Sequence, residues 1–286
     1  MRRDRVVELI GRYYQQYGTD LNLAYPSDGI GGWKTARLPL NVDRTALVIM
    51  HAFYGGEAEA YPEQFQRVEY LERCYQIARH VYPALLAAVR EAGMRIYHVP
   101  FGSGYYEEFP GYQRAEKLAE EYRPVRDRAV QDPVAEKLYA FKADHALGDG
   151  EGSRFRIAKT VAASNAAGGF LLEAMPVGEE GIATGERQLA ALATADEVNH
   201  LIYIGFALDG CLLTAAGGMM DMLRRGFLCS TVADAVTAIE CRESGRDQGH
   251  LQTGLWRVGS SGGGMVYESA ELIRALKQPN QLNSYK

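Results

Sequence analysis

The chain has 286 residues, of which 47% are hydrophobic and 23% are charged, and its formal net charge is −5. This composition is ordinary for a globular protein that buries one large hydrophobic core or two modest ones. The acidic balance and the lack of a basic cluster argue against nucleic acid and anionic membrane surfaces as partners.

The cysteines show no CxxC spacing; they are Cys74, Cys211, Cys229 and Cys241. This pattern argues against a zinc site or a disulfide framework and indicates a reducing compartment. The N-terminal residues lack the apolar core of a signal peptide, and no apolar run reaches the length of a membrane span. We therefore expect a cytoplasmic protein that does not contact a membrane.

The first 43 residues are predicted to precede the main domain as a separate unit. An amphipathic helix is predicted over residues 2–17. Its apolar face consists of Val6, Leu9, Ile10, Tyr13 and Tyr14. Residues 19–43 are rich in Gly, Pro and Asp, which predicts an extended arm that lies on the domain or on a partner subunit. Residues 44–286 are predicted to form a single α/β domain.

The main domain shows apolar β-prone runs that alternate with segments of helical spacing. The predicted strands are residues 46–50, 94–99, 170–174, 201–204 and 227–232. The predicted helices are residues 70–91, 114–122, 124–139, 186–194, 211–225, 236–243 and 268–277. Pro83 is expected to kink or break the first of these helices. This alternation predicts a three-layer α/β/α fold around a mostly parallel sheet.

Residues 100–170 are the least regular part of the domain. We interpret them as an insertion or lid near the strand ends, since long loops in compact domains tend to be functional. Candidates for the wall of a pocket in this segment are Tyr105, Tyr106 and Tyr112. The GDGEG sequence at 148–152 has no preceding strand at the spacing of a nucleotide-binding loop, so no cofactor is expected.

His51 directly follows the first predicted strand of the main domain. In open α/β sheets, ligands bind beyond the carboxyl ends of the strands, so His51 lies where chemistry is normally placed. Phe53 and Tyr54 follow and are further candidates for the pocket wall. A purely structural histidine and core packing of the two aromatic side chains are the alternatives.

Cys211 lies beyond the strand at 201–204, at the start of the predicted helix. The amides of a first helical turn and the helix dipole favour a thiolate, which predicts a thiol pKa below its ordinary value. The same amides can receive a developing oxyanion during acyl transfer. The alternative is a small, inert cysteine in the core.

Residues 205–235, GFALDGCLLTAAGGMMDMLRRGFLCSTVADA, resemble the isochorismatase-like cysteine hydrolases, which include nicotinamidases and N-carbamoyl amidohydrolases. The positions that carry the resemblance are Gly205, Asp209, Cys211, Gly226 and Asp234-Ala235. Weaker agreement extends it to about half of the chain, while residues 1–43 and 100–170 have no clear counterpart. The resemblance implies the same three-layer α/β fold.

The sequence departs from the family's catalytic pattern in two places. The family has an activating Asp at the end of the first strand, where this chain has His51, and a Lys in a region that here, at 179–185, contains none. Lys159 of the insertion is a poor substitute. The Asp-x-His metal signature is missing because Asp144 and His145 are adjacent, so no metal is expected. Vinyl-ether hydrolysis, which relies on the absent Asp, is disfavoured.

The resemblance implies a hydrolase that attacks a C–N bond of a small amide or related acyl compound. Cys211 would be the nucleophile and His51 its base, with a ring nitrogen about 3–4 Å from the sulfur. It also implies a non-proline cis peptide between Phe206 and Ala207 and an oxyanion hole formed by the amides of Ala207 and Cys211.

The loss of two of the three catalytic groups of the family also fits an alternative hypothesis. In this alternative the protein is a catalytically inactive small-molecule binding protein that kept the pocket. The family and the N-terminal arm suggest a homodimer or a higher homo-oligomer.

Overall fold

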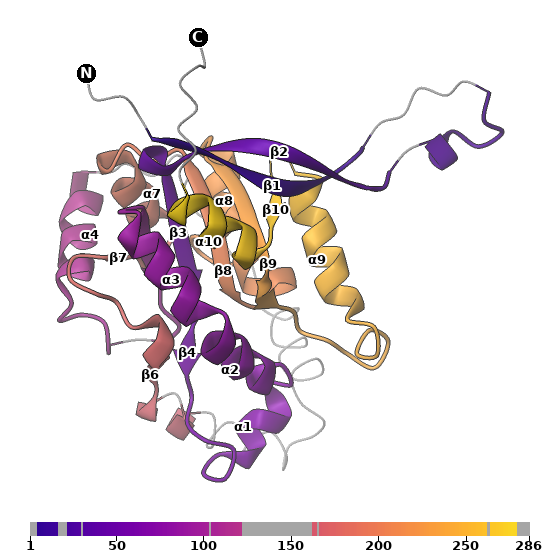
Figure 1. Cartoon of the computed structure of the whole chain (residues 1–286). Coiled ribbons are helices and arrows are strands. Elements are labelled where there is room, and N and C mark those ends of the chain that lie inside the picture. Colours follow the sequence, from indigo (N-terminus) through magenta and orange to yellow (C-terminus); the bar gives the residue numbers. More distant parts are fainter. Residues whose placement is uncertain are drawn as a thin grey trace, which may run out of the picture.

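The computed structural model describes residues 5–16, 22–29, 31–102, 104–121, 162–164, 166–261 and 264–278. Their centre is an eight-stranded sheet in the order β2-β1-β10-β9-β8-β3-β5-β7 (Figure 1). Its strands are β1 Val6–Tyr14, β2 Trp33–Asn41, β3 Thr45–Met50, β5 Arg95–Val99, β7 Gly181–Ile182, β8 His200–Phe206, β9 Leu228–Thr237 and β10 Val266–Tyr267. A separate two-stranded sheet pairs β4 Phe53–Tyr54 with β6 Gly169–Phe170.

The sheet is mostly parallel and carries helices on both faces, which confirms the predicted α/β fold. The strands from β10 to β7 pair in parallel, whereas β1 is antiparallel to both β10 and β2. The helices are α1 Pro62–Arg67, α2 Leu71–His80, α3 Tyr82–Glu91, α4 Pro110–Glu121, α7 Glu186–Ala195, α8 Met219–Arg224, α9 Gly249–Gly259 and α10 Ser269–Lys277.

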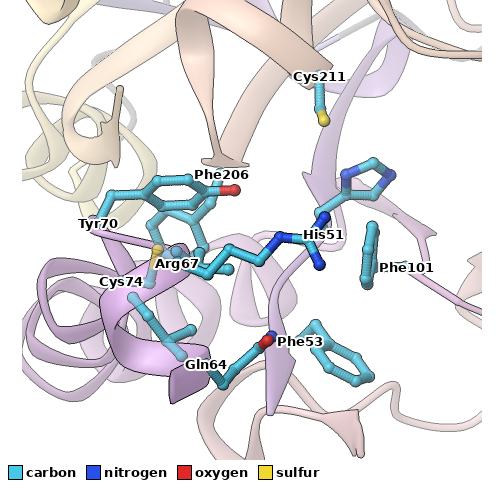
Figure 2. A pocket seen from close by; sticks show the side chains of 11 residues that line it. His51, Phe53, Gln64, Arg67, Tyr70, Cys74, Phe101, Phe206 and Cys211 are labelled. Atoms are coloured by element: carbon cyan, nitrogen blue, oxygen red, sulfur yellow. The ribbon is translucent and has the colours of Figure 1, made fainter. Parts of the chain in front are cut away.

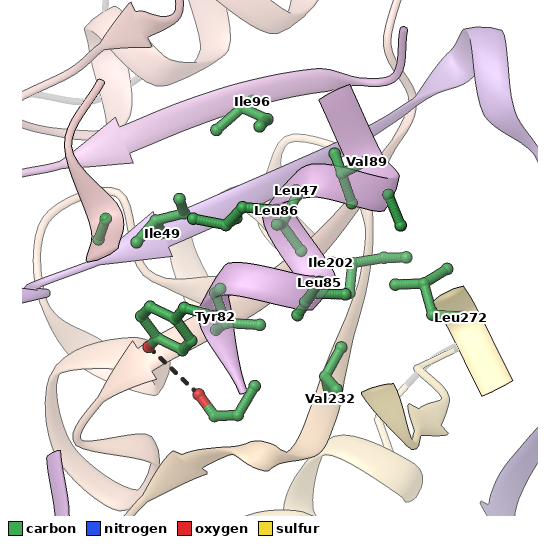
Figure 3. Close-up of a cluster of buried hydrophobic side chains, with 14 of the residues drawn as sticks. Leu47, Ile49, Tyr82, Leu85, Leu86, Val89, Ile96, Ile202, Val232 and Leu272 are labelled. Atoms are coloured by element: carbon green, nitrogen blue, oxygen red, sulfur yellow. Dashed lines mark hydrogen bonds between the residues drawn. The ribbon is translucent and has the colours of Figure 1, made fainter. Parts of the chain in front are cut away.

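Strand β3 shows how one strand supplies two hydrophobic cores. All six of its residues are buried, and alternate side chains point to opposite faces of the sheet. Leu47 and Ile49 pack with α2, α3 and α10. The close-up of that core shows them with Leu86 of α3 and Leu272 of α10 (Figure 3). Ala46, Val48 and Met50 pack on the other face with α4, α7, α8 and α9.

The predicted N-terminal helix is wrong, because Val6–Tyr14 forms strand β1. The apolar residues of this segment fit a helical spacing, but they also alternate: Val7 and Leu9 are buried and Ile10 is 44% exposed. Pairing with β2 runs along the whole strand, from Val6–Asn41 to Tyr14–Trp33, so tertiary hydrogen bonds decide the structure. The predicted arm is therefore in part the second strand of a hairpin at the sheet edge. The domain boundary at residue 44 stays a prediction.

Other element predictions are confirmed or corrected by the described residues. The helix at 70–91 breaks at Val81 into α2 and α3, with Pro83 in the first turn of α3. The strand predicted at 170–174 is only the two-residue β6, followed by a 3-10 turn at Leu172–Ala174. Residues 236–243 are not a helix, because β9 extends to Thr237; the helix in this region is α9.

Parts of the insertion cannot be compared with their predictions. The predicted helix at 124–139, the GDGEG sequence, Asp144-His145 and Lys159 lie outside the described residues.

A half-buried ionic network joins helix α3 to two strands. Glu180, just before β7, receives hydrogen bonds from Arg90 Nε at 2.7 Å and Arg90 Nη2 at 3.0 Å. His98 of β5 lies 2.8 Å from the same carboxylate, and its side chain is 1% exposed. Burial raises the pKa of Glu180, but hydrogen bonds from His98 and Arg90 outweigh that effect and hold the pKa at about 2.

Replacing Glu180 by Gln is expected to lower the free energy of unfolding at neutral pH by about 2–4 kcal/mol, because Arg90 loses its counter-charge. The pKa of Glu180 falls from 4.5 to about 2 on folding. The carboxylate therefore stabilises the protein above pH 4.5, and this contribution is lost as the pH falls toward 2. Urea denaturation across this pH range measures both effects.

The matched control for that variant is Asp221→Asn on the protein surface. Asp221 pairs with Arg224 at 3.5 Å, and the arginine side chain is 68% exposed. Removing this charge is expected to change the free energy of unfolding by less than about 0.5 kcal/mol. Equal effects of the two substitutions would contradict the importance of the Glu180 network.

Candidate active site

A cavity of about 190 Å³ opens beyond the carboxyl ends of β3 and β8. Its lining residues are His51, Phe53, Gln64, Arg67, Val68, Tyr70, Leu71, Cys74, Phe101, Phe206 and Cys211 (Figure 2). The neighbouring strands β3 and β8 run parallel, so His51 and Phe206 meet at the same edge of the sheet. The sheet topology thereby brings the two predicted catalytic residues, Cys211 and His51, to one cavity.

His51 occupies a tight turn directly after β3. Its φ of 54° is in the left-handed region, which non-glycine residues adopt at a cost of about 1–2 kcal/mol. The backbone is held by the His51 amide, which donates to the carbonyl of Val99 at 2.8 Å. Its ring packs edge-on against Phe101, with centroids 5.4 Å apart. Burial lowers the pKa of His51 to about 4, so the imidazole is neutral at physiological pH.

Cys211 lies in a single wide turn instead of at the head of a long helix. Residues Leu208–Leu212 form a π-helical turn, in which the Leu212 amide donates to the carbonyl of Ala207 at 3.0 Å. The predicted helix 211–225 is interrupted before α8 begins at Met219. The helix-dipole argument for a thiolate therefore does not apply, although π-turns of this kind are frequent at functional sites.

The thiol of Cys211 is neutral in the resting protein. Burial raises its pKa, and hydrogen bonding from the backbone of Ala207 and of Cys211 opposes that effect without overcoming it. The expected lowering of the thiol pKa is therefore wrong, because desolvation outweighs the amides. The site holds a neutral thiol and a neutral imidazole in the same cavity.

The backbone of two residues nevertheless acts to lower the pKa of the Cys211 thiol. They are Ala207 and Cys211, the residues that were predicted to form an oxyanion hole. The peptide bond between Phe206 and Ala207 is cis, the geometry that the sequence resemblance implied at this position. A pair of amides beside a sulfur can also receive a negative oxygen that forms on an atom bonded to that sulfur.

The hydrogen bond expected between His51 and Cys211 is not formed. Within the part of the chain that the structure describes, none joins the His51 ring to the Cys211 sulfur. Both side chains line the cavity, and Figure 2 shows the sulfur pointing into it on the side where the His51 ring lies.

The aromatic residues proposed for the pocket wall take different places. Phe53 lines the cavity, and so does Phe101 from the start of the insertion. Tyr105 lies behind Phe53, with ring centroids 6.0 Å apart. Tyr106 and Tyr112 pack against each other at 5.1 Å and do not line the cavity. Tyr54 also lies outside the lining: it stacks on Tyr75, and its hydroxyl donates to Glu57.

The segment 64–74 was not recognised as part of the site. It supplies Gln64, Arg67, Val68, Tyr70, Leu71 and Cys74 to the lining. The only signal in the sequence was Pro62, because proline is common in the first turn of a helix and here begins α1. The apolar residues follow a helical spacing only from Leu71 onward. Helix α1 precedes this residue, so the sequence pattern did not predict it.

No group of three or more His, Cys, Asp or Glu side chains that could hold a metal ion occurs in the described parts of the chain. Among the same residues, none of the helices has the length and apolar character that crossing a membrane requires.

No family model matches the sequence, and no curated protein matches it. The fold is similar to solved structures of the families that the sequence resemblance named. A cysteine hydrolase from Pseudomonas syringae pv. phaseolicola has 14% identity and a TM-score of 0.46, with 84% of this chain and 96% of that chain covered. An isochorismatase family protein from Desulfovibrio vulgaris has 14% identity and a TM-score of 0.43, with 82% and 99% covered.

Proposed function

We propose that the protein is a cysteine-dependent hydrolase that cleaves a C–N bond in a small amide or related acyl compound. The observation that carries this proposal is the Cys211 sulfur, which faces a cavity while the backbone of Ala207 and Cys211 acts to lower its pKa. The amides of these two residues are placed to stabilise the oxyanion that forms when the sulfur attacks a carbonyl carbon.

The reaction proceeds through a thioester. The sulfur attacks the amide carbonyl carbon while His51 takes the thiol proton, either after a small side-chain movement or through one water. The tetrahedral intermediate collapses, the C–N bond breaks, and His51 returns the proton to the leaving nitrogen. Water, deprotonated by His51, then attacks the thioester and yields a carboxylic acid and the free thiol.

The cavity favours a small substrate and places apolar side chains beside the sulfur. Its volume is about 190 Å³, and the rings of Phe53, Phe101 and Phe206 contribute to its walls. Apolar walls strengthen the interaction of the amides with a developing negative charge. The same apolar walls raise the thiol pKa, so proton transfer to His51 has to accompany the attack on the carbonyl.

A small-molecule binding protein without turnover is the second candidate. The raised pKa of Cys211 and the missing His51–Cys211 hydrogen bond among the described residues favour it. Both candidates use the same cavity, so only an experiment on the thiol distinguishes them.

The test is to trap the acyl-enzyme. The purified protein is incubated with a panel of small primary amides, the release of ammonia is measured, and acid-quenched samples are analysed by peptide mass spectrometry. We expect ammonia and an acyl adduct on the peptide that contains Cys211. Both signals should disappear in Cys211→Ala and persist in Cys241→Ala, since Cys241 is exposed and outside the cavity. Ligand binding by calorimetry without ammonia or adduct would instead establish the binding protein.

A further inference from the structure

Two polar side chains of helix α1 line the cavity without a role in the proposed reaction. They are Gln64 and Arg67, which lie three residues apart and so on the same side of the helix. Figure 2 shows both side chains extending toward the space below Cys211. The hydrogen-bonding groups and the charge of these two side chains indicate which groups a ligand of the cavity carries.

Gln64 has an unsatisfied acceptor. The residue is 5% exposed, and its Oε1 is buried without a hydrogen-bond partner among the described residues. Leaving such an acceptor unpaired costs about 1–3 kcal/mol, so buried acceptors are nearly always paired. A ligand in the cavity that carries an N–H group supplies the missing donor.

Arg67 places a positive charge at the same cavity. Its guanidinium makes no hydrogen bond or ion pair with any residue that the structure describes. No Asp or Glu is among the described residues that line the cavity, so none of these residues balances the charge of the exposed Arg67 side chain there. A guanidinium presents parallel N–H groups that match the two oxygens of a carboxylate.

We propose that the substrate of this site is a small amide that also carries a carboxylate. Arg67 binds the carboxylate at the rim of the cavity, Gln64 accepts a hydrogen bond from an N–H of the same molecule, and the amide carbonyl lies at Cys211. This inference rests on the proposed hydrolase function, because it uses the same cavity and the same sulfur.

The test compares two alkylating agents of nearly equal size, anionic iodoacetate and neutral iodoacetamide. Their rate constants at Cys211 are measured by mass spectrometry, and the ratio is referred to that of 2-mercaptoethanol, a thiol without charged neighbours. We expect the iodoacetate-to-iodoacetamide ratio at Cys211 to exceed the reference by about tenfold or more. Arg67→Gln should return the ratio to the reference value.

Two further variants control this result. Arg257→Gln makes the same change in net charge on the exposed face of α9, outside the cavity, and should leave the ratio unchanged. Gln64→Met should slow alkylation by iodoacetamide, which carries N–H groups, more than alkylation by iodoacetate. Its melting temperature should stay equal or rise, because an unpaired buried acceptor is replaced by an apolar side chain of similar shape.

The outcomes separate this inference from the function on which it rests. If both reagents label Cys211 at the reference ratio and Arg67→Gln does not change that ratio, the proposed carboxylate site is wrong. The assignment of Cys211 as the nucleophile is then unaffected. If neither reagent labels Cys211, the hydrolase proposal fails and this inference fails with it.

Discussion

Amide hydrolysis by His51→Ala is expected to be about 10²–10⁴-fold slower than by the wild type, the usual contribution of a general base. The reason is the raised pKa of Cys211: the thiol holds its proton until another group accepts it. Among the described residues, His51 is the histidine in the cavity lining, and its neutral ring is able to accept that proton. Initial rates with the best amide of the trapping panel measure the effect.

The pH dependence of kcat/KM in the wild type identifies the base. Burial lowers the pKa of His51 from 6.5 to about 4, so the ring stays neutral and active as the pH falls through 6.5. Activity should decline only near pH 4, where the ring becomes protonated. Circular dichroism at each pH confirms that the protein remains folded over the measured range.

The matched control is His80→Ala, which removes an exposed histidine of α2 whose ring contacts the carbonyl of Gln76 within its own helix. This variant should keep the wild-type rate and pH profile. An acid limb near pH 6.5 in the wild type, or full activity in His51→Ala, would assign proton transfer to another group.

Gly205→Ala is expected to lower the free energy of unfolding by more than about 4 kcal/mol, or to prevent accumulation of folded protein. Gly205 pairs with Met50 where β8 and β3 lie side by side at the centre of the sheet. A Cβ on Gly205 would lie 1.9 Å from the carbonyl oxygen of Met50, and the φ of +125° is unfavourable for any other residue. To remove this steric clash, the two central strands would have to move apart beside the cavity.

Gly226→Ala separates the steric clash from the backbone effect. Gly226 follows α8 with a φ of +90°, but a Cβ there would meet no atom within 4 Å. Gly226→Ala is therefore expected to lower the free energy of unfolding only by the cost of the positive φ, about 1–3 kcal/mol. Urea denaturation of both variants gives the comparison. If Gly205→Ala proves no less stable than Gly226→Ala, the contact with Met50 relaxes at little cost.

The sequence alone determined the central architecture of this protein. Strands β3, β5 and β8 are short apolar runs bounded by turns, and such runs have few alternatives to burial in a parallel sheet. The break at Pro83 was equally predictable, because proline cannot donate the hydrogen bond that a continuous helix needs. The placement of His51 and Cys211 at one edge follows from the topology rule for parallel strands.

The tertiary structure decided the features that depend on residues far apart in the chain. Segment Val6–Tyr14 carries a spacing that suits a helix and a strand, and its pairing with Trp33–Asn41 selects the strand. The thiol pKa of Cys211 is set by burial among residues from several elements, which local sequence does not report. Helix α1 brings Gln64 and Arg67 to a cavity that it shares with residues following β3 and β8. The net charge and the hydrogen bonds at a site depend on all the residues that surround it. Because folding brings these residues together, neither property can be derived from one segment of the sequence.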